Sequence, residues 1–456
     1  MKKEIVIIGG GFAGINLTKQ LENEPGFQVT LVDKNNYNFF PPLLYQVATG
    51  FLEVSNISYP FRKLFHGKKN IRFRLGELVK IVPDQNKVLL STGELAYDYL
   101  VLATGTVSNY FGIDNIRKFG LPMKTVDDAI EMRNYLLQRT EEATITTDEN
   151  ERRKLGTIVI AGGGPTGVEI AGMLAETRSN ILEKDYPELS ARKLKIYLVD
   201  GAPSLLPPMS RDTQQYTYDT LVKMGVEVKL NKLVKDYTND TVVFADGEQI
   251  ETKTLIWTAG VTASVFEGIP KESYGRGRRL LVDDYNKVAG TANIYAIGDT
   301  CLQTSDKNFP NGHPQLAQVA MQQGKNLAQN FLAIERGKAP KAFEYSDRGS
   351  MAIIGRSKAA ADLVRPTLHL QGFIAWTIWL FIHLFSLISY RNRIKTMYNW
   401  VLAYFTKDQS LRMIIRPKVN KKEASPMVKP IKTFARTDDR NLRARKQRQV
   451  EPGSVK

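Results

Sequence analysis

Two sets of three glycines are spaced for binding the pyrophosphate of a dinucleotide. The first set is Gly9, Gly11 and Gly14, and the second is Gly162, Gly164 and Gly167. In this spacing the first glycine permits a tight turn, the second lets the backbone approach the pyrophosphate, and the third lets a helix pack closely on a strand. The free N–H groups of that helix then face the anion. One chain with two such loops is expected to bind two nucleotides.

Each glycine loop has the sequence context that its function requires. A short run of β-branched residues precedes it, at 5–8 and at 157–161, and a segment typical of a helix follows. This strand, turn and helix complete the dinucleotide fingerprint. A single glycine-rich turn often arises by chance, but two loops with matching strands do not. We therefore predict two Rossmann-like units.

An acidic residue ends the next predicted strand of each unit. Asp33 follows the run 28–32, and Asp200 follows the run 195–199, which is delayed by an extra segment at 183–191. A carboxylate at this place accepts hydrogen bonds from the adenosine ribose. It also repels a 2′-phosphate, and Gly201 and Ala202 offer no arginine to bind one. The second site is therefore expected to prefer NADH to NADPH.

Later strands are predicted to complete the first unit. The runs 98–105 and 253–260 each form an apolar strand that ends in a small-residue turn, as expected of paired crossings between the two units. The second unit would then be inserted within the first. The chain returns for the strand at 293–299, where Asp299 can contact the ribityl chain of a flavin.

With these features the chain resembles the flavoproteins with two dinucleotide-binding domains, whose first site holds FAD and whose second holds a nicotinamide cofactor. Two stretches narrow the resemblance, the run 38–50 and the segment Ala317–Gly324. The latter is similar to the signature Ala-Gln-x-Ala-x-Gln-x-Gly of type II NADH dehydrogenases. Residues 375–376, 383–384 and 391–393 are similar to the membrane-anchoring region of that family.

The resemblance implies an α/β fold like that of glutathione reductase, followed by amphipathic membrane-anchoring helices. The expected domains are an FAD-binding domain in two parts, 1–112 and 261–345, an inserted NADH-binding domain, 113–260, a membrane-anchoring region, 346–412, and a basic tail, 413–456.

Motifs and resemblance together predict the cofactor sites. The FAD site is predicted at Gly9, Gly11, Phe12, Ala13, Gly14, Asp33, Lys34, Thr104, Gly105, Gly298, Asp299, Ala317 and Gln318. The NADH site is predicted at Gly162, Gly164, Pro165, Thr166, Gly167, Glu169, Asp200, Ala259 and Gly260. No metal site is predicted.

Glu169 lies two residues after Gly167, in the first part of the predicted helix. The resemblance implies that it contacts the nicotinamide. The alternative is an acid that complements the helix dipole, an effect of about 0.3–1 kcal/mol. We favour the functional interpretation, because the first turn of this helix also forms the wall of the cofactor site.

A second helix is predicted to start at Pro314, since proline suits the first helical position. Its N-terminus would stabilise negative charge on the reduced flavin. Gln318 and Gln322 are four residues apart and share one face of this helix, so both amides could bind one carbonyl ligand. Spacing alone slightly favours a packing role for them, whereas the resemblance assigns this face to the quinone.

A stiff loop with an aromatic tip could line the quinone entrance. It contains Pro42, Tyr45 and Gln46. The same residues would suit packing under a sheet edge, so both interpretations stay open.

The C-terminal region is predicted to dock on a membrane. Residues 373–390 are uncharged, and as a helix they would span about 27 Å, just short of the hydrocarbon layer of about 30 Å. We favour a helix lying on the surface, because His383, Ser386, Tyr390 and Arg393 are spaced to form one polar stripe. The segment 394–405 mixes aromatic residues with Lys395 and suits the headgroup layer. The alternative is a dimer interface, and the resembled family combines both.

The chain carries a net charge of +16, half of it in residues 417–456, which hold 12 Lys and Arg against 4 Asp and Glu. This segment has few apolar residues and is predicted to be disordered, with an attraction for anionic lipid of about 1 kcal/mol per basic residue near the surface. Nucleic-acid binding is disfavoured, because no stacking platform or recognition motif accompanies the charge.

Cys301 is the single cysteine, which excludes an internal disulfide and fits a reducing compartment. Flavoenzymes that reduce disulfides or oxidise sulfide need a cysteine pair, so electrons must leave the flavin by another route. We expect Cys301 to be an inert packing residue.

These observations predict a peripheral enzyme on the cytoplasmic face of the cell membrane, expected to be a homodimer. It would pass a hydride from NADH to FAD and two electrons to a membrane quinone, feeding the respiratory chain. No proton pumping is expected, because the sequence lacks multiple spanning helices with charged residues. Two alternatives are a soluble NADH-dependent flavoprotein reductase of a protein acceptor, and a redox sensor that binds FAD and NADH but turns over slowly.

Overall fold

The computed structural model describes residues 2–179, 183–189, 194–364, 367–406 and 411–415. The basic segment 417–456, for which disorder is predicted, lies outside these residues.

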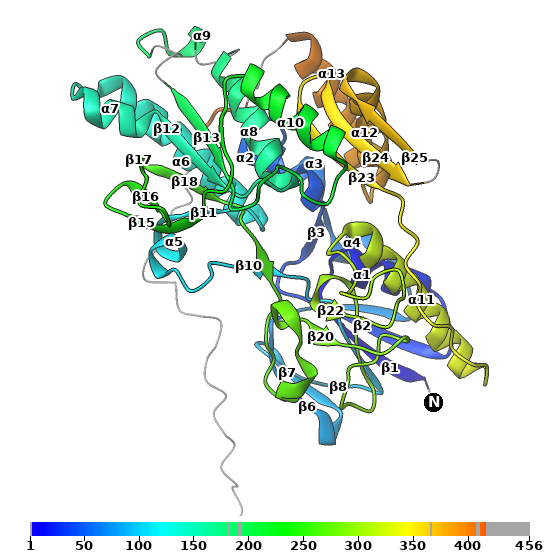
Figure 1. Cartoon of the computed structure of the whole chain (residues 1–456). Helices are drawn as coiled ribbons and strands as arrows, with labels where there is room; N and C mark the ends of the chain where they lie inside the picture. The colour runs from blue at the N-terminus through cyan, green and yellow to red at the C-terminus, as the bar shows by residue number, and fades with distance from the viewer. Residues whose placement is uncertain (1, 180–182, 190–193, 365–366, 407–410, 416–456) are drawn as a thin grey trace, which may run out of the picture. The chain divides into compact units, whose positions relative to one another are not determined.

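The first predicted strands form a five-stranded sheet in the order β21, β9, β1, β2, β5 (Figure 1). The strands are β1 (Lys3–Ile8), β2 (Phe27–Asp33), β5 (Ile71–Leu75), β9 (Tyr99–Leu102) and β21 (Ile294–Ala296). All neighbouring strands are parallel, so their carboxyl ends meet at one edge. Ligands of open parallel sheets bind at this edge.

Two helices cover one face of this sheet, α1 (Phe12–Gln20) and α11 (Ala317–Glu335). Ile7 of the sheet and Phe331 of α11 share the core between them. The two helices approach closely, because a Cβ atom on Gly324 would lie 2.5 Å from the carbonyl oxygen of Ala13. Helix packing therefore requires the last glycine of the Ala317–Gly324 signature.

The helix α11 begins at Ala317, so the predicted start at Pro314 is wrong. The N–H of Leu316 donates to the carbonyl oxygen of Pro314 at 2.9 Å, which makes this segment a turn. The side-chain amide of Gln315 donates to the carbonyl oxygen of Asp299 at 3.0 Å. This contact with the end of β21 fixes the turn, and it overrides the preference of proline for the first helical position.

An antiparallel meander packs on the other face of the first sheet. It consists of β6 (Leu78–Val82), β7 (Lys87–Leu90) and β8 (Gly93–Ala96). Val6 and Leu100 of the sheet pack against Ile81 and Val88 of the meander. Alternate residues of β1 thus serve two cores, as expected of a strand buried on both faces.

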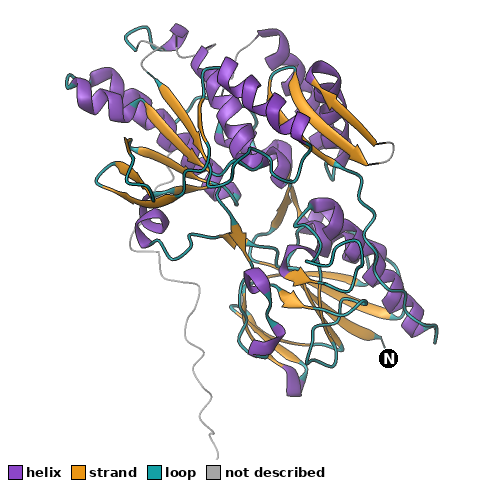
Figure 2. Cartoon of the chain, viewed as in Figure 1, coloured by secondary structure: helices purple, strands orange, loops and turns teal. Residues whose placement is uncertain are grey.

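The second glycine loop belongs to a second parallel sheet, in the order β11, β18, β12, β13, β14. Its strands are β11 (Leu121–Pro122), β12 (Thr157–Ala161), β13 (Lys195–Val199), β14 (Glu227–Lys229) and β18 (Thr254–Trp257). The helices α6 (Val126–Ile145), α8 (Pro165–Thr177) and α10 (Arg211–Lys223) share a core with one face. A meander of β15 (Val234–Thr238), β16 (Thr241–Phe244) and β17 (Gln249–Glu251) packs on the other. Figure 2 shows helices flanking the strands of both sheets.

A two-stranded ribbon links the sheets. β10 (Val107–Ser108) and β19 (Val261–Thr262) pair antiparallel, with Val107 opposite Thr262. The chain builds the second sheet between them and afterwards returns to the first sheet with β21.

Short elements connect these layers. They are β3 (Tyr37–Phe39), β4 (Ser58–Pro60), α2 (Leu44–Ala48), α3 (Val54–Ile57), α4 (Phe61–Leu64), α5 (Asp114–Phe119), α7 (Glu149–Leu155), α9 (Glu183–Asp185), β20 (Leu280–Leu281) and β22 (Cys301–Leu302), with a 3-10 turn at Pro41–Leu43 before α2.

The C-terminal part contains an antiparallel sheet and two helices. These elements are β23 (Ser350–Gly355), β24 (Lys358–Val364), β25 (Thr367–Gln371), α12 (Gly372–Ser386) and α13 (Tyr390–Thr406). Ala375, Trp379 and Trp400 bury one side of the helices in a core shared with α2, α6 and α8. Within the described ranges, no helix is long and apolar enough to cross a bilayer.

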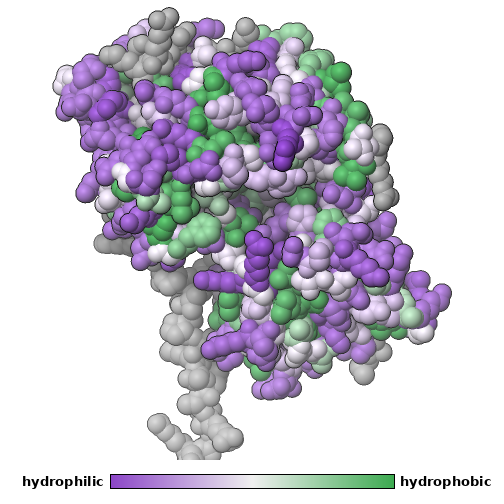
Figure 3. Space-filling model, viewed as in Figure 1, coloured by the Kyte–Doolittle hydropathy of each residue, from purple (hydrophilic) through white to green (hydrophobic). Residues whose placement is uncertain are grey.

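The other side of α12 and α13 exposes large apolar residues. They are Phe373, Ile374, Phe381, Ile382, Phe385, Tyr390, Ile394, Met397, Tyr398, Val401, Leu402 and Phe405. On the face drawn in Figure 3, by contrast, hydrophilic residues predominate and apolar ones form separate groups. Exposed apolar clusters of this size mark contacts with a partner or a membrane.

The polar stripe predicted for one helix is wrong. His383 and Ser386 lie on α12, whereas Tyr390 and Arg393 lie on α13. The ring of His383 also faces inward and stacks on Trp379, with centroids 3.8 Å apart. Its neighbours Phe381 and Phe385 are 63% and 54% exposed. The outer side of α12 is therefore apolar, because the polar ring satisfies its hydrogen bond inside.

His383 is expected to make the protein less stable in mild acid. Burial lowers the pKa of His383 from 6.5 to about 4, although its ring Nδ1 donates to the Trp379 carbonyl oxygen at 2.7 Å. Between these two values the unfolded chain binds more protons, so the stabilisation is present above pH 6.5 and is lost as the pH falls towards 4. We expect this residue to remove about 2 kcal/mol from the free energy of unfolding between pH 7 and pH 5.

Denaturant unfolding at several pH values would measure this effect, with His383→Gln as the comparison. The variant should lack this part of the pH dependence, since glutamine does not titrate. Identical pH profiles for the two proteins would contradict the assignment.

Candidate active site

The first glycine loop connects β1 to α1 and has the geometry of a phosphate cradle. Gly9 has φ +109°, and a Cβ atom there would lie 2.3 Å from the carbonyl oxygen of Ala103. A Cβ atom on Gly14 would lie 1.9 Å from the carbonyl oxygen of Gly9. Gly11 instead faces open space, with nothing within 4 Å. The loop therefore has no room for a side chain where the helix packs on the strand, but its backbone is accessible at Gly11, where a pyrophosphate would bind. This geometry fits FAD.

The second loop repeats this geometry between β12 and α8. Gly162 has φ +116°, and a Cβ atom there would lie 2.6 Å from the carbonyl oxygen of Thr258. A Cβ atom on Gly167 would lie 1.8 Å from the carbonyl oxygen of Gly162, whereas Gly164 faces open space. The second loop fits a dinucleotide for the same reasons as the first.

The two predicted ribose anchors are held alike. In the first unit the Asp33 carboxylate accepts the N–H of Gly10 at 2.6 Å and that of Asn35 at 2.7 Å. In the second unit the Asp200 carboxylate accepts the N–H of Gly163 and that of Ala202. Burial raises the pKa of Asp33, while these N–H donors lower it. Each carboxylate thus braces its glycine loop and is oriented by two backbone donors.

Several predicted FAD residues meet at the carboxyl edge of the first sheet. Thr104 and Gly105 follow β9, and Gly298 and Asp299 follow β21. Gly105 has φ +63° and faces open space, so the backbone is accessible there. The other members begin α1 (Phe12, Ala13), follow β2 (Lys34) or begin α11 (Ala317, Gln318).

A buried amide beside this edge lacks one partner. Gln323 is 0% exposed, and its Oε1 accepts the N–H of Gly298 at 2.7 Å. Its Nε2 has no hydrogen-bond partner among the described residues. A donor left free beside Gly298 fits a site that a polar cofactor completes.

The predicted NADH residues gather at the corresponding edge of the second sheet. Pro165 and Thr166 begin α8 after the second glycine loop, and Ala259 and Gly260 follow β18. A Cβ atom on Gly260 would lie 3.1 Å from the ring of Phe111. The residues predicted for NADH therefore lie together at the carboxyl edge of the second sheet.

Glu169 is half-buried on α8 and lines a cavity of about 500 Å³. Burial raises the pKa of its carboxyl well above the ordinary value, although a hydrogen bond with the Ile353 backbone lowers it. Glu176 lies two turns further along α8, lines the same cavity, and also has a pKa raised by burial. The helix that follows the second glycine loop therefore presents two carboxyl groups whose pKa is raised by burial.

The cavity is mostly apolar, and residues of α12 and α13 form part of its wall. Met173, Ile353, Trp376 and Leu384 are among its lining residues. Such a lining, with a few polar groups, is typical of a site for an apolar ligand.

Tyr45 and Gln46 of α2 supply the polar end of the cavity. The amide of Gln46 donates to the Tyr45 hydroxyl at 2.8 Å, and its oxygen accepts the indole N–H of Trp400 at 2.8 Å. Burial raises the pKa of the Tyr45 hydroxyl. Two of the predicted quinone residues thus belong to one hydrogen-bonded chain that ties α2 to α13.

The other predicted quinone residues lie outside this cavity. Gln318 donates to the Gly349 carbonyl oxygen at 2.9 Å and accepts the N–H of Arg348 at 3.2 Å. Gln322 donates to the Ser346 carbonyl oxygen at 2.9 Å and accepts the N–H of the same residue at 3.1 Å. Pro42 belongs to the 3-10 turn before α2. The two amides therefore hold the segment that leads into β23, and this strand forms part of the cavity wall.

Sequence reasoning missed three polar residues near these sites. Arg356 and Glu176 line the cavity, and Lys124 lies between the two units. Only Glu176 had a sequence signal, since it follows Glu169 by seven residues and so shares one helical face.

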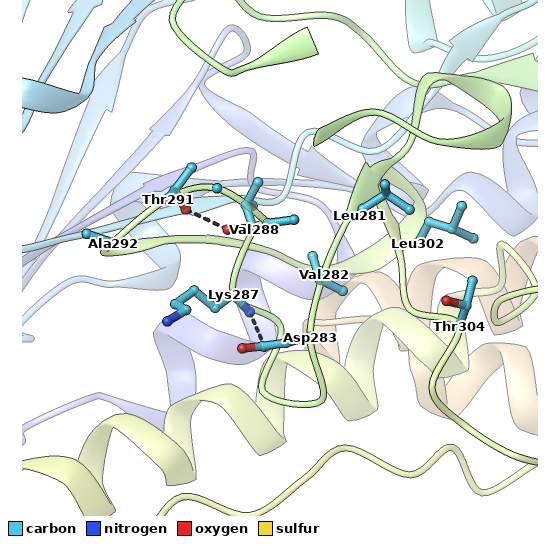
Figure 4. A pocket seen from close by; sticks show the side chains of 11 residues that line it. Leu281, Val282, Asp283, Lys287, Val288, Thr291, Ala292, Leu302 and Thr304 are labelled. Atoms are coloured by element: carbon cyan, nitrogen blue, oxygen red, sulfur yellow. Dashed lines mark hydrogen bonds between the residues drawn. The ribbon is translucent and has the colours of Figure 1, made fainter. Parts of the chain in front are cut away.

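A further hollow, of about 630 Å³, lies over residues 281–304 (Figure 4). It contains none of the predicted site residues. Asp283 lines this hollow, and its carboxylate accepts the N–H groups of Tyr285 and Lys287. These bonds stabilise the turn that follows Asp283.

Cys301 is buried at 1% exposure, next to the first site. Burial raises its pKa to about 11, and its thiol donates to Gln323 at 3.4 Å. This environment matches an inert packing residue.

Comparison with known proteins adds independent findings. A family model described as pyridine nucleotide-disulphide oxidoreductase matches residues 3–324, and one described as NDH2 C-terminal domain matches residues 348–407. The type II NADH:quinone oxidoreductase NdhA of Mycobacterium tuberculosis is 35% identical over 420 residues, covering 88% of this chain and 87% of its own length. The type II NADH:quinone oxidoreductase of Haemophilus influenzae is 30% identical over 395 residues, covering 79% and 87%.

Solved structures share the fold. NDH2 from Plasmodium falciparum in complex with NADH superposes with a TM-score of 0.83 at 22% identity, covering 91% of this chain and all of that one. The sulfide:quinone oxidoreductase of Aquifex aeolicus superposes with a TM-score of 0.67 at 21% identity, covering 89% and 96%.

Proposed function

The chain belongs to the type II NADH:quinone oxidoreductases and oxidises NADH with reduction of a quinone, and we propose that it does so with FAD in the first site and the quinone in the cavity of Glu169 and Tyr45. The main support for this proposal comes from helix α8. The second glycine loop leads into this helix, and the helix also bears the Glu169 carboxyl group that lines the cavity. The helix α8 thus connects the proposed NADH site to the apolar cavity.

A flavin supplies the chemistry that links the two substrates, since it accepts a hydride and then releases electrons to another acceptor. The first loop and Asp33 would hold the FAD pyrophosphate and ribose, and Asp299 its ribityl chain. The second loop and Asp200 would hold NADH. Glu169 would close the nicotinamide end.

Protonated groups in the cavity suit the formation of a quinol, which takes up two protons with two electrons. Glu169 and Glu176 are the carboxyl groups proposed to supply protons, because burial raises the pKa of both above its ordinary value. The Tyr45 hydroxyl has its oxygen bonded to Gln46, so its own proton is available to a quinone carbonyl. In this proposal the residues orient the quinone and supply protons, while Gln318 and Gln322 act by fixing the segment before β23.

The exposed side of α12 and α13 is proposed to rest on an anionic membrane surface, next to the basic residues Arg391 and Lys395. An apolar quinone could then pass from the lipid into the cavity, whose wall includes Phe373 and Phe405. The quinol so formed would serve the respiratory chain from the cytoplasmic face. A second copy of the chain is the other occupant that this surface would suit, as in a homodimer.

The two half-reactions test the quinone assignment. Purified protein is mixed anaerobically with NADH, the loss of the visible flavin band is followed, and a soluble quinone analogue is then added. Tyr45→Phe should slow recovery of the band by about tenfold, the effect of one hydrogen bond of roughly 1.4 kcal/mol. The rate at which NADH reduces the flavin of Tyr45→Phe should stay at the wild-type value. Gln318→Ala should likewise slow recovery more than reduction.

Asn326→Ala is the matched control for Gln318→Ala. Its amide also ties α11 to a backbone carbonyl, that of Lys341 at 3.2 Å, but not to the segment before β23. Equal slowing of both half-reactions in Tyr45→Phe and Gln318→Ala would refute the placement of the quinone. Recovery with a protein acceptor alone would favour a reductase of another protein, and slow turnover with every acceptor would favour a sensor.

Asp200→Ala tests the second nucleotide site. Loss of a charged acceptor should weaken NADH binding by roughly 10- to 100-fold, equal to about 1.5–3 kcal/mol. The preference for NADH over NADPH should shrink as well, since the repulsion of a 2′-phosphate is removed. Titration of both nucleotides into the oxidised protein measures this, and unchanged NADH affinity would contradict the role of Asp200.

A further inference from the structure

Lys124 places a cation between the two nucleotide units. Its side chain is half-buried, and its Nζ donates to the hydroxyl of Thr106 at 2.8 Å. Burial lowers the pKa of Lys124, and the charge of Asp299 raises it. An ammonium group withdrawn from water is costly unless it meets negative charge or hydrogen-bond acceptors.

The backbone of Lys124 is fixed by the start of α6. The N–H groups of Lys124 and Thr125 donate to the Asp128 carboxylate at 2.9 and 2.8 Å. The Asp128 N–H donates in return to the Thr125 hydroxyl at 3.1 Å, which completes a capping box. Lys124 therefore projects from a rigid helix end rather than from a loose loop.

The ammonium reaches the edge of the first sheet where the FAD residues of β9 and β21 meet. Thr106 is 7% exposed and follows Gly105, whose outer side is open. The Thr106 hydroxyl donates to the Asp299 carboxylate at 3.4 Å. A chain of hydrogen bonds thus runs from the Lys124 ammonium through the Thr106 hydroxyl to the Asp299 carboxylate, which is assigned to the ribityl chain. The adenosine anchor, Asp33, lies instead at the end of β2.

The positive charge of Lys124 would affect the reaction at the flavin. A flavin bound here would receive two electrons and one proton as a hydride from NADH, so it would gain one negative charge as NAD⁺ is released. A fixed cation in a water-poor site stabilises such a charge more strongly than it would in water. Asp299 is negative and acts in the opposite sense, so the cation also offsets this carboxylate.

We infer that Lys124 is a positioning residue of the flavin site, whose ammonium group favours the reduced over the oxidised flavin. This inference rests on the proposed binding of FAD to the first unit. The competing explanation is that Lys124 merely ties the inserted unit to the first one through Thr106.

The test compares Lys124→Met, which removes the charge, with Lys124→Arg, which keeps it. The midpoint potential of the bound flavin is measured by equilibration with redox dyes, and bound FAD and thermal stability are measured on the same samples. We expect Lys124→Met to lower the ratio of reduced to oxidised flavin at least tenfold, which for a two-electron couple is a shift of about 30 mV to more negative potential. Lys124→Arg should stay near the wild-type potential.

Two further variants serve as controls. Lys3→Met removes an exposed lysine that is bonded to Asp98 at 3.0 Å, and it should leave the potential unchanged. Thr106→Val breaks the hydrogen bond between the units but keeps the cation, so it should lower stability with a smaller shift of potential than Lys124→Met. A tie between the units would instead give equal losses of stability in Lys124→Met and Thr106→Val with no shift of potential, and would overturn the inference.

If Lys124→Met loses FAD during purification, the potential is measured after reconstitution with excess FAD and on Lys124→Gln. Equal weakening of oxidised and reduced FAD would also overturn the inference. Wild-type protein that holds no FAD would refute the cofactor assignment itself, an outcome distinct from either result with the lysine variants.

Discussion

Gly14→Val is expected to yield protein without flavin, whereas Gly167→Val is expected to keep its flavin and lose reduction by NADH. The reason is the same in both loops. A Cβ atom would lie 1.9 Å from the Gly9 carbonyl oxygen in one loop and 1.8 Å from that of Gly162 in the other. The helix must then move away from its strand, and the N–H groups that face the phosphate move with it. Misplacement of a bound group by about 1 Å can cost 100-fold.

The measurement has two steps. The visible spectrum of each purified variant gives its FAD content, and anaerobic mixing with NADH gives the rate of flavin reduction, which should fall about 100-fold or more in Gly167→Val. Gly201→Ala is a control, because its added Cβ atom would meet its nearest neighbour at 3.5 Å, an ordinary contact. Loss of the same nucleotide in both variants would contradict the assignment of one nucleotide to each loop.

The second large effect concerns the outer side of α12 and α13. Changing Ile374, Phe385, Ile394 and Leu402 together to glutamine is expected to abolish binding to anionic lipid vesicles. All four are exposed, and none lines the cavity. We take each side chain to contribute about 1 kcal/mol to the free energy of membrane binding, which is less than the value for full burial. Loss of all four contributions lowers the affinity for vesicles about 1000-fold. Activity with a soluble quinone analogue should persist, since the cavity is intact.

Vesicle sedimentation and the oligomeric mass of the same variant provide the readout. Four exposed apolar residues elsewhere, Val79, Ile145, Leu233 and Val265, serve as the matched control set for glutamine substitution. Undiminished vesicle binding by the α12 and α13 variant would refute membrane docking by this surface. Conversion of a dimer to a monomer without a change in vesicle binding would show that the surface serves a second copy of the chain.

The parts of the fold that local sequence determines were predictable. Gly9 and Gly162 need a positive φ, and Gly14 and Gly167 need the absence of a side chain, so spacing alone located both loops. The β-branched runs around them are buried on both faces and form parallel strands, as such runs usually do. Asp33 was placed at the end of its strand for the same reason, because the fingerprint fixes its distance from the loop.

Features that depend on distant contacts were not predictable. The cavity joins residues as far apart as Tyr45, Glu169 and Phe405. No glycine or proline marks the end of α12, and its position follows from the burial of Leu387, which is 1% exposed. Spacing put Gln318 on the correct helix and slightly favoured a packing role for it, but it could not identify the backbone of Gly349 as the partner of its amide.

The buried state of Cys301 makes the chain well suited to site-directed labelling. With a pKa of about 11, its thiol is almost entirely protonated at neutral pH, and at 1% exposure it is shielded from reagents in solution. A maleimide or a spin label would therefore react at an introduced surface cysteine and leave the native one untouched. Probes placed one at a time along α12 would then report the depth of each position below the lipid headgroups.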